Sequence, residues 1–93
     1  MNAKAHEVEV HVKSLKTNAK TEFKIVETAT LDEVWTESGS AGRLNEPRAA
    51  GDTFRCQDGT DLSNRLGDSL ETLLAEDVCR NRHFEIRGDS GGA

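Results

Sequence analysis

The residues whose types and order most clearly suggest a chemical role are the last six, Gly88-Asp89-Ser90-Gly91-Gly92-Ala93. A folded domain gains no packing from such a tail, because glycine has no side chain to bury. Adjacent glycines also keep the backbone slim enough to enter a narrow channel. Two interpretations follow. The tail is either an ordinary frayed terminus, or a segment that another protein's active site takes up as its substrate.

The chain also contains two cysteines. Cys56 and Cys79 lack C-x-x-C spacing and are too few for a disulfide scaffold, so we expect buried, reduced thiols, as in a cytoplasmic protein. Cys79 and His83 have the residue types of a nucleophile and its base. Because no third residue evidently orients them, we expect no catalytic site there.

None of the three histidines has a recognised metal-ligand spacing, so we expect no metal site. His6 and His11 lie in or beside a strand-like segment, and we expect both to face solvent rather than share an ion. Trp35 carries the only indole of the chain. We expect it to pack in the core or at its rim, not to hold a ligand.

The formal net charge of −5 argues against a nucleic-acid partner, whose phosphates require a basic face. No apolar run approaches the ~18 residues of a membrane span, so we expect no membrane partner. Residues 1–6 have no apolar core and do not resemble a secretory signal. A chain of 93 residues that is 34% hydrophobic predicts one domain with one modest core, and we expect a cytoplasmic monomer.

Four segments alternate apolar and polar residues, as half-buried strands do. They span residues 7–13, 21–26, 52–57 and 83–87. The polar stretch 16–20 predicts a turn that makes the first two strands a hairpin. Asp58-Gly59 is a strong hairpin-turn signal and predicts a short returning strand at 60–62.

Thr30 and Glu33 match the S/T-x-x-E capping box, which predicts a helix start. The apolar face of this helix carries Leu31, Val34 and Trp35. We expect the helix to end near Ser38 or to continue poorly to Leu44. The leucine spacing predicts a second, short helical turn over residues 69–75.

This order of elements, with a last strand that must pair near the sheet centre, resembles the β-grasp fold of ubiquitin. The resemblance runs from about Glu7 to Gly92. It rests on the first strand Val8–Leu15, the helix start at Thr30, the Asp58-Gly59 turn, the leucines Leu62–Leu74, and the last strand with its diglycine. It implies an α+β, β-grasp (ubiquitin-like) fold, with a mixed four- to five-stranded sheet and one main helix packed on one face. We expect a flexible segment 1–6, a domain 7–87 and a flexible tail 88–93.

The chain also resembles the ubiquitin-like modifiers of bacterial conjugation operons, which implies a protein modifier and not an enzyme. In such proteins an activating enzyme uses ATP to adenylate the terminal glycine, here Gly92, with Gly91 as spacer. A conjugating enzyme then carries the glycine as a thioester to an amine, usually lysine, of a target protein. Ala93 would first be removed by a processing protease, either a JAB-type or a cysteine protease. No cofactor bound to the chain itself is implied.

All five lysines lie in the first quarter of the chain: Lys4, Lys13, Lys16, Lys20 and Lys24. We expect them to keep an edge hairpin soluble. As an alternative, they accept Gly92 of another copy and so build chains.

The chain departs from ubiquitin in two places. Positions predicted to point outward from the later strands are polar, where ubiquitin has an apolar patch: Thr53, Arg55, Gln57, His83, Glu85 and Arg87. Asp89-Ser90 also replace a basic, apolar linker, so we expect dedicated partner enzymes. Two further alternatives stay open, a sulfur carrier of the same fold, which usually ends directly in Gly-Gly, and a protein-binding module whose tail is inert.

Overall fold

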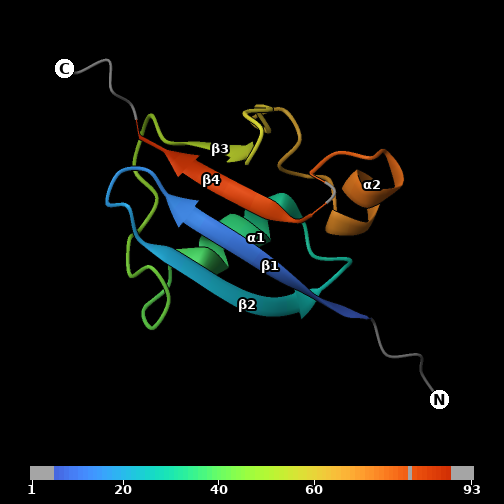
Figure 1. Ribbon diagram of the computed structural model, residues 1–93, viewed down its shortest axis with the longest axis horizontal. Coiled ribbons are helices and arrows are strands. Elements are labelled where there is room, and N and C mark those ends of the chain that lie inside the picture. The colour runs from blue at the N-terminus through green and yellow to red at the C-terminus, as the bar shows by residue number, and fades with distance from the viewer. Residues whose placement is uncertain (1–5, 80, 89–93) are drawn as a thin grey trace.

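The computed structural model describes residues 6–79 and 81–88, which form a small α+β arrangement of a four-stranded mixed sheet and two helices (Figure 1). The elements are β1 (Glu7–Ser14), β2 (Lys20–Val26), α1 (Leu31–Ser38), β3 (Thr53–Cys56), α2 (Leu70–Ala75) and β4 (His83–Arg87). All four predicted strand segments and both predicted helical segments are therefore present.

The sheet has the order β2-β1-β4-β3. β1 pairs antiparallel with β2 and parallel with β4, while β4 pairs antiparallel with β3. The last strand is therefore central, as expected, and α1 lies across one face of the sheet, behind it in Figure 1. The arrangement is compatible with a β-grasp.

Alternation in the hairpin decides which side chains enter the core. Val10 lies opposite Phe23 and both are buried, whereas their neighbours in sequence point to the other face. The turn between the strands closes when the Ser14 N–H donates to the Ala19 carbonyl. Asn18 adopts a left-handed φ of 65° there, a conformation that asparagine tolerates better than most residues.

The capping box at the start of α1 is present. The Glu33 N–H donates to the Thr30 hydroxyl, and the Glu33 carboxylate accepts from the Thr30 N–H. The helix ends at Ser38 and does not continue to Leu44. The chain turns at Gly39, where an added Cβ would lie 2.5 Å from the Glu46 carbonyl oxygen. Within the described residues, neither helix is long and apolar enough to cross a membrane.

The starts of the two helices lie side by side. Thr30 and Ser69, their N-cap residues, form an antiparallel bridge. The Leu31 N–H donates to the Asp68 carbonyl at 2.9 Å, and the Leu70 N–H donates to the Ala29 carbonyl at 3.0 Å. Each helix start thus pairs a backbone N–H that has no partner within its own helix with a carbonyl of the segment that leads into the other helix.

The returning strand expected at 60–62 does not form. A single bridge between Arg55 and Asp61 is all that remains of it. The carboxylates of Asp58 and Asp61 instead accept backbone and hydroxyl hydrogen bonds from Thr60 and Ser63, two residues further along. Such local bonds favour turns over an extended strand.

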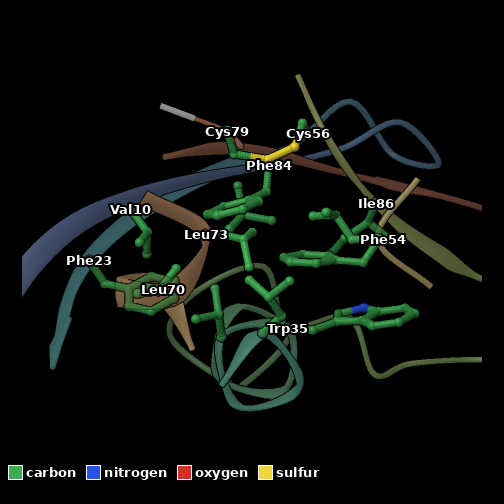
Figure 2. Packing of buried hydrophobic residues seen from close by; sticks show 14 residues of the cluster. Val10, Phe23, Trp35, Phe54, Cys56, Leu70, Leu73, Cys79, Phe84 and Ile86 are labelled. Atoms are coloured by element: carbon green, nitrogen blue, oxygen red, sulfur yellow. A yellow bond between two sulfur atoms is a disulfide. The ribbon is translucent and has the colours of Figure 1, made fainter. Parts of the chain in front are cut away.

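Aromatic stacking organises the core between the sheet and α1 (Figure 2). The Phe54 ring lies between the rings of Trp35 and Phe84, with centroid separations of 5.3 and 5.1 Å. Trp35 is 5% exposed, which confirms its predicted packing role. The Arg48 guanidinium lies 3.9 Å from the centroid of the Trp35 ring.

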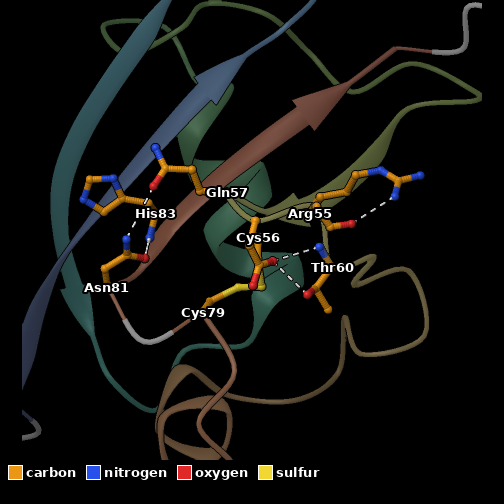
Figure 3. The surroundings of a disulfide bond; sticks show 9 residues. Arg55, Cys56, Gln57, Thr60, Cys79, Asn81 and His83 are labelled. Atoms are coloured by element: carbon orange, nitrogen blue, oxygen red, sulfur yellow. Dashed lines mark hydrogen bonds between the residues drawn. A yellow bond between two sulfur atoms is a disulfide. The ribbon is translucent and has the colours of Figure 1, made fainter.

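The prediction of reduced cysteines is wrong. Cys56 and Cys79 are both buried, as expected, but they form a disulfide (Figure 3). Cys56 ends β3 opposite Phe84 in β4, so the loop that precedes β4 reaches it, and the two Cα atoms are 5.3 Å apart. This separation is ordinary for a disulfide. The argument for a cytoplasmic location from reduced thiols therefore fails, and the compartment stays a prediction.

Reduction should destabilise the protein, because the Cys56–Cys79 bond closes a loop that contains α2 and spans a sequence separation of 23. Without the bond the unfolded chain gains conformational entropy, so we expect the free energy of unfolding to decrease by about 3 kcal/mol. Urea denaturation with and without dithiothreitol measures it. The Cys56→Ala/Cys79→Ala double variant is the control and should not respond to reductant. Equal wild-type curves in both conditions would contradict the prediction.

Candidate functional site

Gly91, Gly92 and Ala93, the predicted donor and processing residues, lie outside the described residues, as does Lys4. The described chain ends at Gly88, directly after β4. The candidate site that can be built is therefore the base of the tail. We use this name for the end of β4, the β1–β2 turn and the segment 46–52 beside them.

The β1–β2 turn holds the base of the tail in place. The Leu15 N–H donates to the Ile86 carbonyl at 2.8 Å, which continues the β1–β4 ladder past the end of β1. The Lys16 side chain crosses Gly88 so closely that an added Cβ would lie 2.7 Å from the Lys16 Cδ. Gly88 therefore has a packing reason to be glycine, apart from any role in the tail.

Lys16 is anchored by two carboxylates. Its Nζ lies 2.6 Å from Asp52 Oδ2 and 3.4 Å from Glu46 Oε2. The Asp52 side chain is only 3% exposed, and its carboxylate also accepts the Ala49 N–H. This cluster joins the turn to a distant loop.

Glu46 has its own supporting hydrogen bonds. The buried Ser14 hydroxyl donates to Oε2 at 2.7 Å, and the Thr17 hydroxyl donates to Oε1 at 2.9 Å. Partial burial works against ionisation of this carboxyl. The hydrogen bonds from Ser14, Thr17 and Lys16, with the Lys16 charge, outweigh it and lower the Glu46 pKa below its ordinary value.

The same contacts change the chemistry of Lys16. The hydrogen bond to Asp52 is the main cause of a raised Lys16 pKa, and Glu46 adds to the effect against partial desolvation. Acyl transfer needs the neutral amine, and this ammonium is held in its charged form. Among the predicted acceptors, Lys16 is therefore poorly suited to that role.

The other described lysines lie on the outward face of the hairpin. Lys13 and Lys20 are directly opposite each other across β1 and β2, and Lys24 is opposite Glu9. Lys20 and Lys24 are exposed and Lys13 is half-buried. None of the three forms an ion pair within the described part of the chain.

The outward face of the sheet is polar, as predicted for the later strands. The six outward positions on and beside β3 and β4 are partly or fully exposed: Thr53, Arg55, Gln57, His83, Glu85 and Arg87. Two features of this face were not predicted. His11 stacks on His83 with ring centroids 4.3 Å apart, and its ring lies between the carboxylates of Glu9 and Glu22. The contact between His11 and Glu22 could have been predicted from the register of the hairpin, because the two residues lie directly opposite each other.

Cys79 cannot act as a nucleophile while its sulfur is bonded to Cys56. The His83 ring stacks against His11, and the His83 backbone N–H donates to the Asn81 side-chain oxygen at 3.2 Å.

Comparison of the chain with protein-family models and with curated proteins gave no match.

Glu46 should make the free energy of unfolding depend on pH in the acid range. Its lowered pKa means that folding favours the ionised form, so its contribution is present above the ordinary value of 4.5 and is lost as the pH falls through the folded value. Glu46→Gln should reduce the free energy of unfolding near pH 7 by about 1 to 2 kcal/mol. It should also flatten the loss of stability that sets in as the pH falls below the ordinary Glu46 pKa of 4.5.

Urea denaturation at a series of pH values, from pH 7 down into the acid range, measures both effects. Glu7→Gln, at an exposed position of β1, removes the same charge away from the cluster and should follow the wild type. An acid profile of Glu46→Gln identical to that of the wild type would rule out the assigned role.

Proposed function

We propose that this chain is a ubiquitin-like protein modifier with a β-grasp fold, the carried group of an enzymatic transfer and not itself an enzyme. The observation that carries the proposal is the position of β4. This strand lies at the sheet centre, parallel to β1, and continues directly into the glycine-rich tail. The sheet order β2-β1-β4-β3, with α1 on one face, is compatible with this fold.

The base of the tail supports the same function. Because Gly88 is packed under Lys16, and Lys16 is anchored to Asp52, the tail leaves the domain from a defined point. A partner that recognises the folded domain can then receive the tail in a consistent direction. Preorganisation of this kind lowers the entropy cost of association.

In the proposed reaction a protease removes Ala93 and exposes the Gly92 carboxylate. In an activating enzyme the Gly92 carboxylate then attacks the α-phosphorus of ATP, which forms the adenylate and releases pyrophosphate. A cysteine thiolate attacks this adenylate to give a thioester and release AMP. A conjugating enzyme carries the acyl group to the amine of a target lysine, and the thiol leaves as the amide forms. Gly91 gives the tail the clearance to enter each channel. The chain itself contributes the carboxylate and needs no bound cofactor.

The test compares the full-length chain, the chain shortened to residue 92, and the shortened chain with Gly92→Ala. Each is incubated with ATP and the activating enzyme from its genomic neighbourhood, and intact mass and non-reducing gels detect adducts. Only the form that ends in Gly92 should give a thioester. In a parallel incubation with sulfide as the sulfur donor, a thiocarboxylate formed by displacement of AMP, with no protein adduct in either incubation, would identify a sulfur carrier instead. Failure of all three forms with an active enzyme would rule out both, leaving a binding module.

If chains form, the acceptor lysines should differ in reactivity. Lys16 should be modified several-fold less than Lys13, Lys20 or Lys24, because its carboxylate partners hold the ammonium charged. Mass spectrometry of Gly-Gly remnants measures the ratio. Asp52→Asn removes the closest carboxylate and should raise modification at Lys16. Preferred modification of Lys16 in the wild type would contradict the assignment.

A further inference from the structure

A second cluster lies on the outward face of the sheet, away from the base of the tail. The His11 ring has a carboxylate at each nitrogen. Nδ1 is 3.2 Å from Glu22 Oε2, and Nε2 is 3.6 Å from Glu9 Oε1. One donor atom from each of the three residues can be chosen so that all lie within 4.8 Å of one another.

Three pieces of backbone geometry create this cluster. Strand alternation puts Glu9 and His11 on one face of β1. The hairpin register places Glu22 directly opposite His11, and the parallel β1–β4 register places His83 opposite it on the other side. The His83 ring then stacks on the His11 ring, which restricts how the His11 ring can turn.

The spacing of the donors suits a small metal ion. Two ligands about 2.0 to 2.1 Å from a tetrahedral Zn²⁺ are about 3.3 Å apart, close to the separation of His11 Nδ1 and Glu22 Oε2. Glu9 lies at the other ring nitrogen, Nε2, so its carboxylate must move to reach an ion bound at Nδ1 beside Glu22. The Glu9 and Glu22 side chains are 51% and 60% exposed, so both can rotate toward the ion. A metal would take the place of the proton on one ring nitrogen.

The charges around the cluster act in both directions and bear on which metal would bind. Within the described residues, neither Glu9 nor Glu22 has a lysine or arginine within ion-pair distance. His11, Glu22 and His83 also line a hollow on this face, which gives a ligand access. Lys24 lies opposite Glu9, and the Lys13–Lys20 pair lies two residues along the hairpin from the His11–Glu22 pair. These ammonium groups weaken binding by charge alone, which favours a metal that bonds to imidazole over Ca²⁺ or Mg²⁺.

We propose that Glu9, His11 and Glu22 form a Zn²⁺ site on the outward face of the sheet. Three protein ligands leave the fourth tetrahedral position to water or to a group from another molecule. His83 acts as a positioning residue that holds the His11 ring in place. The sequence suggested no such site, because the ligands meet across strands and not at a fixed spacing along the chain. The proposal does not depend on the proposed modifier function.

Isothermal titration of the tag-free, full-length chain with ZnCl₂, near neutral pH and without reductant so that the disulfide stays closed, tests the site. We expect one Zn²⁺ per chain. His11→Gln and Glu22→Gln should each weaken binding about tenfold or more. His6→Gln and Glu7→Gln are matched controls, which remove a histidine and a carboxylate just outside the cluster, and both should bind as the wild type does.

Amide chemical shifts provide a second measurement. Zn²⁺ should shift signals of β1, β2 and the start of β4, and circular dichroism should show that each variant is folded. The proposal is overturned if the wild type binds no Zn²⁺. It is equally overturned if folded His11→Gln and Glu22→Gln retain wild-type affinity, because the ion would then be held elsewhere.

Discussion

The parallel pairing of β1 with β4 is the interaction on which the rest of the structure depends. It joins the two ends of the described chain, with His11 opposite His83 and Ser14 opposite Ile86. On one face it brings Val12 beside Phe84 in the core. On the other it places the two histidine rings together, and at its far end it sets Gly88 beneath Lys16. The base of the tail is a consequence of this register, and so is the position of the His83 ring beside the proposed metal site.

Local chemistry was sufficient to predict most of the elements. The capping box of Thr30 and Glu33 marks the start of α1, and the Ser69 side chain caps α2 in the segment predicted from leucine spacing. Strand alternation correctly separated the buried Phe54 and Phe84 from their polar neighbours. These features depend on residues within about one helical turn or a few strand positions of each other, so they can be recognised in a linear pattern.

The contacts that define the base of the tail and the disulfide join residues far apart in sequence, which is why they were missed. Ser14 meets Glu46 across 32 positions, and Cys56 meets Cys79 across 23. No spacing rule indicates either pair, because each depends on strand order and on the path of a loop. The missing strand at 60–62 has a local cause instead. Aspartate side chains there compete for backbone N–H groups, and alternation alone does not show this.

The fixed position of Gly88 limits how far the end of the tail can lie from the domain. Four residues link it to Gly92, and an extended chain covers at most about 3.6 Å per residue, so the Gly92 carboxylate, the donor group of the proposed modifier, stays within about 14 Å of Gly88. A catalytic centre that accepts the tail must therefore approach the β1–β2 turn and the segment 46–52. The far end of the sheet, where β2 ends, is left free to contact other molecules at the same time.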